Sequence, residues 1–160
     1  MLALFALLLA AAQADRSSDR LPPANPVPRV DTEEGQVIAA VNTLLAAIGR
    51  SDGAGVIAAT RPDGIATVAA ERPDGTRMVR TVRWQAFAAQ LKPGTDRLEE
   101  RLGDTAVEID GDIALLWAPF TFRVNGRVVH CGTDHFDLVR ENGAWRVLNV
   151  TWSQRIAGCG

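Results

Sequence analysis

Two Asn-Gly dipeptides, Asn125-Gly126 and Asn142-Gly143, divide the last third of the chain into strand-rich runs. Asn-Gly is the dipeptide that best supports a two-residue type I′ turn between antiparallel strands, because both of its residues tolerate a positive φ. The runs around these turns extend over residues 113–124, 127–141 and 144–155, and a preceding run covers residues 98–109. The sequence therefore predicts a four-stranded antiparallel meander.

The region before this meander has helical periodicity. Asp31 and Glu34 resemble a capping box, and apolar residues follow at helical spacing: Val37, Val41, Leu44, Leu45 and Ile48. We expect a helix of about four turns here and a short second helix that ends before Arg61. Two strands over 65–71 and 76–82 and a third helix over 84–91 should follow. This order predicts an α+β fold in which three helices cover one face of a curved, mostly antiparallel sheet.

An apolar run over residues 2–12 begins the chain. Its length suits the core of a signal peptide and is too short to span a bilayer. Ala12 and Ala14 are small residues at the positions that signal peptidase reads, so we expect a signal peptide over 1–14 and an exported protein, periplasmic or secreted. The run has no preceding Lys or Arg, so an ordinary amphipathic start is the alternative.

Three further boundaries follow from composition. Residues 15–31 are rich in proline and charge, which predicts a disordered linker. The folded domain is expected over residues 32–156 and a short tail over 157–160.

Charge and metal-ligand content exclude several kinds of partner. The chain has 17 Lys and Arg residues against 19 Asp and Glu residues. Without a basic surplus to neutralise phosphates, we expect no nucleic acid partner and, after signal cleavage, no membrane partner. The two His and two Cys residues have no metal-ligand spacing, so no metal site is predicted. No nucleotide or phosphate-binding motif is present, so no cofactor is expected.

Several motifs of the last third occur together. They are Trp117-Ala-Pro-Phe-Thr-Phe, the two Asn-Gly turns, the run from His130 to Leu138, and Gly143-Ala-Trp-Arg-Val. With this order of elements, the chain resembles the nuclear transport factor 2-like superfamily over about residues 32–155. It looks most similar to the exported, polyketide-cyclase-like members, many of uncharacterised function.

The resemblance implies a cone-shaped α+β barrel, often dimeric, with a pocket between three helices and the concave face of the sheet. It implies no single activity, because this fold hosts isomerases, dehydratases, cyclases and non-catalytic binders. Ketosteroid isomerases of the superfamily use a Tyr oxyanion donor. This chain has no Tyr, so that constellation does not transfer.

The two turns also predict which side chains share a face of the sheet. If no bulge interrupts the hairpins, Asp134 faces Trp117 on one neighbouring strand and Thr151 on the other. This face is apolar at one end and polar at the other, which is how small-molecule pockets are usually composed. Its predicted ligand-binding residues are Trp117, Thr121, Phe136, Asn149 and Thr151. A one-residue bulge would exchange the two faces.

Asp134 and His130 are the predicted catalytic residues. Burial inside a sheet would raise the pKa of Asp134 toward neutrality, as acid–base catalysis requires. His130 lies four residues away on the same face, about 13 Å along an extended strand, so the two side chains would hold opposite ends of one ligand. The structural alternatives are a hydrogen-bonded acid and a rim histidine. Trp117 could stack on a flat ligand, although a Trp in a sheet is more often a core residue.

The opposite face is predicted to form a homodimer. It carries more apolar surface than a monomer usually exposes to water, contributed by Phe120, Phe122, Leu148, Val150 and Trp152. Cys131 on this face and Cys159 in the tail are an even number of cysteines in a chain expected to be exported. The sequence leaves open whether they pair.

Three functions remain compatible with these patterns. The first is an exported domain that binds a small apolar or aromatic ligand without a cofactor. The second is an isomerase, cyclase or dehydratase in which Asp134 and His130 transfer protons, with Asp134 as the base and His130 as the acid or an orienting donor. The third is a non-catalytic dimeric interaction module.

Overall fold

The computed structural model describes residues 32–159 of the chain. The predicted signal peptide, its cleavage before Asp15 and the predicted linker over 15–31 lie outside the described residues. Within the described part, no helix is long and apolar enough to cross a membrane.

Residues 32–159 form three helices and seven strands, and the predicted α+β class is confirmed. The elements are α1 (Glu33–Gly49), α2 (Gly53–Ala59), β1 (Ile65–Glu71), β2 (Arg77–Arg83), α3 (Trp84–Gln90), β3 (Leu98–Leu102), β4 (Ala106–Asp110), β5 (Ile113–Val124), β6 (Arg127–Glu141) and β7 (Ala144–Gln154).

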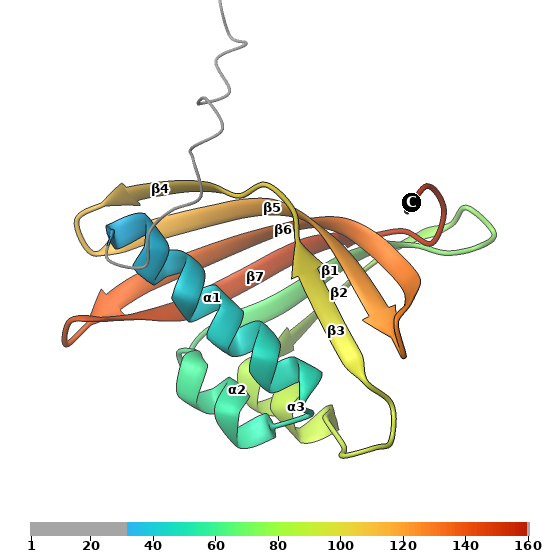
Figure 1. Cartoon of the computed structure of the whole chain (residues 1–160), viewed down its shortest axis with the longest axis horizontal. Helices are drawn as coiled ribbons and strands as arrows, with labels where there is room; N and C mark the ends of the chain where they lie inside the picture. The colour runs from blue at the N-terminus through green and yellow to red at the C-terminus, as the bar shows by residue number, and fades with distance from the viewer. Residues whose placement is uncertain (1–31, 160) are drawn as a thin grey trace, which may run out of the picture.

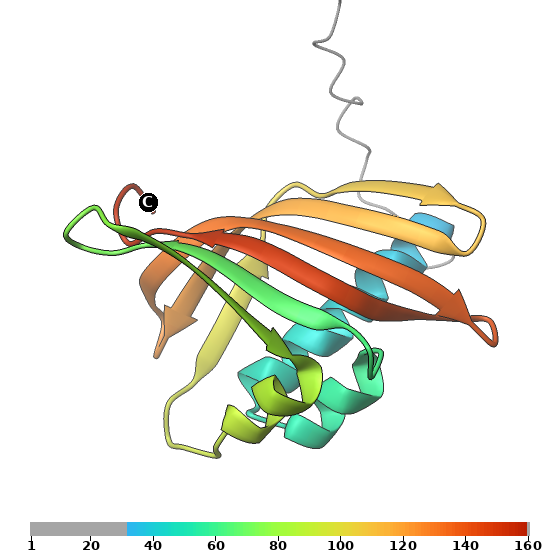
Figure 2. The same ribbon diagram turned by 180° about the vertical axis from the view of Figure 1, so that it is seen from behind.

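The strands form one curved sheet that does not close (Figure 1). Their order is β2-β1-β7-β6-β5-β3, and β4 also pairs with β5. Every pair is antiparallel except β1 with β7. The helices all lie on the same, concave side of the sheet, and in the view from behind α1 (blue) lies behind the strands (Figure 2).

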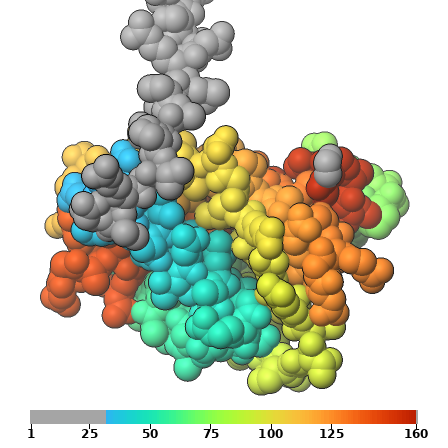
Figure 3. Space-filling model, viewed as in Figure 1, coloured from blue at the N-terminus to red at the C-terminus, as the bar shows by residue number. Residues whose placement is uncertain are grey.

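Helix α1 begins one residue later than the predicted capping box. Thr32 is the N-cap, and its side chain accepts a hydrogen bond at 3.0 Å from the Gly35 amide, which satisfies one of the free amides of the first turn. The predicted apolar stripe faces the sheet, with Val37, Val41 and Leu44 fully buried. Together with β3, α1 covers the concave side of the sheet (Figure 3).

Both predicted turns are present. Asn125 and Gly126 have φ values of 52° and 83°, and Asn142 and Gly143 have 51° and 79°. These positive values at both central residues are the backbone geometry of the type I′ turn. The meander of β5, β6 and β7 is therefore confirmed.

Each of these hairpins contains a register shift, whereas the predicted pairing assumed hairpins without bulges. One lies between Phe122 and Arg123 on β5, and the other between Asp137 and Leu138 on β6. Beyond the shifts, Asp134 pairs with Ala118 and Trp152 instead of Trp117 and Thr151. Side chains alternate between the two faces of a sheet. A shift of one residue in β5 or β7 therefore moves the residues predicted to share a face with Asp134 to the opposite face.

The predicted single strand over residues 98–109 is two strands. The chain breaks at Gly103, whose amide donates to the Pro119 carbonyl at 2.7 Å. An added Cβ there would lie 2.9 Å from the Pro119 ring, so the close approach requires glycine. The break lets β3 pair with the second half of β5 and β4 with its first half.

Candidate functional site

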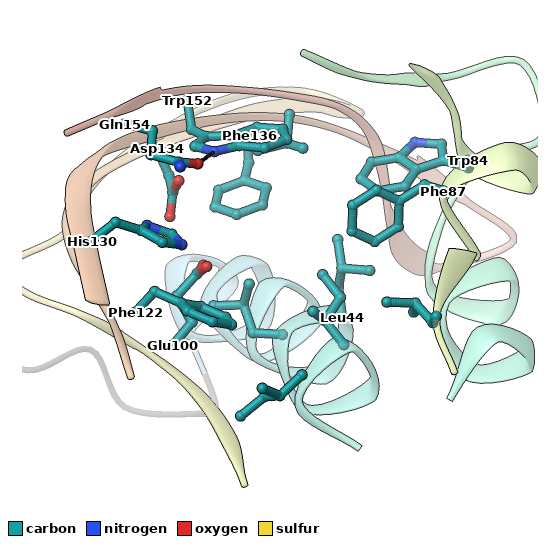
Figure 4. A pocket seen from close by; sticks show the side chains of 15 residues that line it. Leu44, Trp84, Phe87, Glu100, Phe122, His130, Asp134, Phe136, Trp152 and Gln154 are labelled. Atoms are coloured by element: carbon teal, nitrogen blue, oxygen red, sulfur yellow. Dashed lines mark hydrogen bonds between the residues drawn. The ribbon is translucent and has the colours of Figure 1, made fainter. Parts of the chain in front are cut away.

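A cavity of about 260 Å³ lies between the helices and the concave face of the sheet. Five aromatic side chains line it beside aliphatic ones: Trp84, Phe87, Phe122, Phe136 and Trp152. Its polar side chains come from Glu100, His130, Asp134 and Gln154. Figure 4 shows the carboxyl groups and the histidine together at one end, and Trp84 and Phe87 at the other.

Asp134 projects from the middle of β6 into this cavity. Its side chain is buried with 3% exposure, and its Oδ2 atom has no hydrogen-bond partner within the described residues. Burial raises the pKa of Asp134 to about 9, and the neighbouring Glu100 carboxylate adds to the rise. The direction of this shift is the one predicted, but a carboxyl that remains protonated at neutral pH can donate a proton, whereas Asp134 was predicted to be the base.

Glu100 on β3 is the second carboxyl of the site, and it is not among the residues predicted from the sequence. Its side chain points toward that of Asp134 (Figure 4). Burial raises the pKa of Glu100 to about 7, while a hydrogen bond with Asp134 opposes that rise. The same hydrogen bond raises the pKa of Asp134, so the pair holds at least one proton at neutral pH.

A signal for Glu100 was present in the alternation of its strand. Leu98, Glu100 and Leu102 share one side of β3, while Glu99 and Arg101 share the other and form an exposed ion pair at 2.8 Å. A carboxyl flanked by two leucines on one face of a strand indicates burial. This alternation is hard to recognise in the sequence, because the three consecutive charged residues at 99–101 are typical of a solvated surface.

His130 completes the polar end of the cavity. Its ring stacks on Phe122 with centroids 4.7 Å apart and planes 4° apart, and Phe120 contacts its edge at 5.7 Å. Burial lowers the pKa of His130, which favours the neutral imidazole. Its Nδ1 atom has no partner among residues 32–159. A neutral histidine with one free nitrogen can donate or accept a hydrogen bond at a ligand.

The structure brings three of the predicted site residues together: Asp134, His130 and Phe136 all line the cavity. The predicted pocket placement of Trp117, Thr121, Asn149 and Thr151 is wrong. Trp117 on β5 and Thr151 on β7 are each paired with His135, whose side chain faces outward. Thr121 is paired with Cys131. Asn149 donates to Asp137 at 3.3 Å and accepts from the Ile65 amide at 3.1 Å.

The residues predicted for the outer face are displaced by the same register shifts. Phe122, Val150 and Trp152 line the cavity, and Phe120 is buried with the inward-facing residues of β5. Leu148 alone of this set lines a hollow outside the cavity, with Ile113 and Leu115. The convex face therefore carries Ile113, Leu115 and Trp117 in place of the predicted aromatic set.

Cys131 and Cys159 form a disulfide, which resolves the open question of their pairing. The bond holds the C-terminal segment against β6 on the face opposite His130. Because both cysteines are oxidised, neither is a nucleophile. Among residues 32–159, no group of three His, Cys, Asp or Glu side chains could hold a metal ion.

Comparison with solved structures identifies the architecture. An NTF2-like protein from Cytophaga hutchinsonii superposes with a TM-score of 0.63 at 15% identity, over 78% of this chain and 99% of that chain. The chain has the nuclear transport factor 2-like fold. NTF2-like proteins from Novosphingobium aromaticivorans and Shewanella baltica agree, with TM-scores of 0.60 and 0.54 at 14% identity each.

Coverage is similar for these two proteins. The Novosphingobium aromaticivorans protein matches over 78% of this chain and 82% of its own length. The Shewanella baltica protein matches over 77% of this chain and 94% of its own length. At such identities the likeness extends to the NTF2-like fold alone. No protein-family model matches the chain, and no curated protein matches it.

Proposed function

We propose that this NTF2-like chain is an exported domain that binds a small, largely apolar molecule in the cavity between its helices and sheet. The supporting observation is the division of the cavity into an aromatic end and a polar end, the arrangement that orients small ligands in proteins. At the packing density of protein interiors, 260 Å³ accommodates on the order of ten to fifteen non-hydrogen atoms.

Binding is tested by filling the cavity. Val150 lies on the cavity wall, and Val139 lies outside it on the neighbouring strand. We expect 1-naphthol to bind the wild-type protein and Val139→Phe in isothermal titration calorimetry, and binding to Val150→Phe to be at least tenfold weaker. Equal binding to both variants, with circular dichroism showing both folded, would place the ligand elsewhere.

Export is supported by the disulfide between Cys131 and Cys159, since such bonds persist in oxidising compartments. Expression of the full chain in a bacterium tests it. We expect the periplasmic fraction to contain a product that begins at Asp15 and whose intact mass shows a disulfide. A product retained in the cytoplasm at full length would contradict export.

Proton transfer is a second candidate function, in line with the isomerases, cyclases and dehydratases considered above. The specific observation is the pair of facing carboxyls with a raised pKa at both Asp134 and Glu100. In such a pair one group accepts a proton from a ligand while the other donates one, with neutral His130 as an orienting donor.

This second function is tested by solvent exchange. Small ketones that bind the protein would be incubated in D2O and analysed by mass spectrometry. We expect deuterium incorporation with the wild-type protein and with Asp137→Asn, and its loss in Asp134→Asn. Incorporation that persists in Asp134→Asn would remove Asp134 from the reaction.

Homodimer formation through the convex face is also proposed, with corrected residues. Ile113 and Trp117 are large apolar side chains with 60% and 54% exposure on one strand of that face. Exposed apolar groups that cluster on a sheet favour association. The residues that support a dimer are therefore Ile113, Leu115 and Trp117, together with Leu148.

A further inference from the structure

The cavity contains two acids and no base stronger than histidine. Its titratable side chains are Glu100 from β3 and His130 and Asp134 from β6, while α1, α3, β5 and β7 contribute none. No lysine or arginine of residues 32–159 lines the cavity. Arg101 pairs with Glu99 at 2.8 Å, and Arg123 donates to the Gly126 carbonyl at 3.1 Å. Within the described residues, no lysine or arginine therefore balances the carboxyl pair from inside the cavity.

Buried carboxyl groups are usually paired with a cation or a metal ion. A metal ion requires more ligands than this site offers, because residues 32–159 contain no group of three His, Cys, Asp or Glu side chains that could hold one. Oδ2 of Asp134 is moreover without a hydrogen-bond partner there. The pair holds a proton when the cavity is free, and a positively charged ligand that displaces this proton would balance the ionised carboxyls.

Aromatic rings on the cavity walls suit the same kind of ligand. Phe122, Phe136 and Trp152 lie beside the carboxyl pair, and Trp84 and Phe87 lie at the far end (Figure 4). The faces of such rings attract organic ammonium groups while excluding strongly hydrated ions. An anionic ligand is disfavoured because it would meet the carboxyl pair without any compensating cation.

We propose that the ligand of this cavity is a hydrophobic organic amine, bound as its ammonium ion between Glu100 and Asp134 with its hydrocarbon portion against Trp84 and Phe87. This inference rests on the proposed binding function and names the chemical class of the ligand.

Binding of such an ion is coupled to proton release. A cation beside the two carboxyls favours their ionised forms, and the free pair holds at least one proton at neutral pH because burial raises the pKa of both groups. By linkage, affinity for the amine must increase as pH rises from 6 to 8. Burial lowers the pKa of His130, which favours its neutral form and leaves the carboxyl pair as the groups that release the proton.

The test compares three probes of similar shape and different charge by isothermal titration calorimetry. They are 2-(1-naphthyl)ethylamine, its neutral analogue 2-(1-naphthyl)ethanol, and 1-naphthylacetate. At pH 8 we expect the amine to bind at least tenfold more tightly than the alcohol, and the acetate not to bind. Heats measured in buffers of different ionisation enthalpy should show proton release with the amine alone.

Variants assign this preference to the carboxyl pair. Glu100→Gln and Asp134→Asn should each reduce the amine-to-alcohol ratio at least fivefold, whereas Asp137→Asn on the convex face should leave it unchanged. If a cavity variant does not fold, the pH dependence of the wild-type protein supplies the same discrimination.

The outcomes separate this inference from the binding function. Equal or tighter binding of the alcohol at pH 8 would overturn the amine and leave the binding function in place. An amine preference that is unchanged in Glu100→Gln and Asp134→Asn would also overturn it. If none of the naphthyl probes, 1-naphthol included, binds the wild-type protein, both proposals are wrong.

Discussion

Strand β6 carries one histidine and one aspartate on each of its two faces. On the convex face His135 and Asp137 lie 3.4 Å apart, with side chains 38% and 44% exposed. On the concave face Asp134 is buried, and His130 stacks against a phenylalanine. The same two residue types thus form a solvated pair on one side and a desolvated acid with a neutral imidazole on the other. Burial, and not residue type, gives the concave pair its chemistry.

The largest expected effect comes from truncating one apolar residue on each face of β5. Leu116 is fully buried on the concave side, and its neighbour Trp117 is 54% exposed on the convex side. Leu116→Ala should lower the free energy of unfolding by about 2–5 kcal/mol, because it leaves a cavity in the core. Trp117→Ala should cost less than about 1 kcal/mol. Urea denaturation measures both, and equal losses would contradict the assignment of faces.

The disulfide joins the tail to the convex side of β6. It links residues separated by 28 positions, for which loop-closure entropy gives a stabilisation of about 3–4 kcal/mol. The double variant Cys131→Ser and Cys159→Ser should lose up to this free energy of unfolding. Thermal denaturation of the wild-type protein with and without a reductant provides the control, and an unchanged melting temperature would show that the bond does not stabilise the fold.

The pH dependence of stability should differ between the two aspartates. Asp134 has a folded pKa of about 9, above the value near 3.9 of an unfolded chain. The folded state therefore binds more protons, and stability is lost as pH rises between these values. Asp134→Asn removes this loss, so its advantage over wild type should grow by on the order of 1 kcal/mol per pH unit from pH 5 to 8.

Asp137→Asn is the matched control for this experiment, because the residue lies on the same strand and is 44% exposed. Its stability should follow that of the wild-type protein across the pH range. If the two variants showed the same pH profile in chemical denaturation, Asp134 would not be a desolvated carboxyl.

The smallest expected effect concerns association through the convex face. Trp117→Glu places a charge in the proposed dimer interface and should weaken self-association at least tenfold, about 1.4 kcal/mol. Sedimentation equilibrium measures the change. Thr67→Glu is the control. Thr67 on β1 is paired with Thr151 on β7 and with Thr81 on β2, so it lies on the same face but nearer the β2 edge. A wild-type protein that is monomeric at all concentrations would rule out the dimer.

The periodicity of the sequence was sufficient to predict most of the fold. Val37, Val41 and Leu44 predicted the buried face of α1, and the Asn-Gly turns predicted the last three strands. These features are local, because they depend on helical spacing and on the φ values that a dipeptide tolerates. The break at Gly103 was missed because it depends on a distant contact with Pro119.

The site was predicted only in part, for the same reason. Asp134, His130 and Phe136 lie on one strand an even number of positions apart, so their common face could be inferred without knowing any partner strand. The faces of Trp117 and Thr151 depended on pairing across hairpins, and one extra residue in each hairpin exchanged them. Glu100 comes from β3, whose place beside the site depends on its pairing with β5.

The unclosed sheet leaves β2 paired only with β1 within the described residues. This edge carries Arg77, Arg80 and Arg83 in a strand that is mostly exposed. Free backbone amides and carbonyls at a sheet edge can recruit a strand from another molecule, which is a common route to aggregation. A second copy aligned along β2 would bring arginine against arginine. The charges on this strand therefore protect the open cone from growing into a continuous sheet.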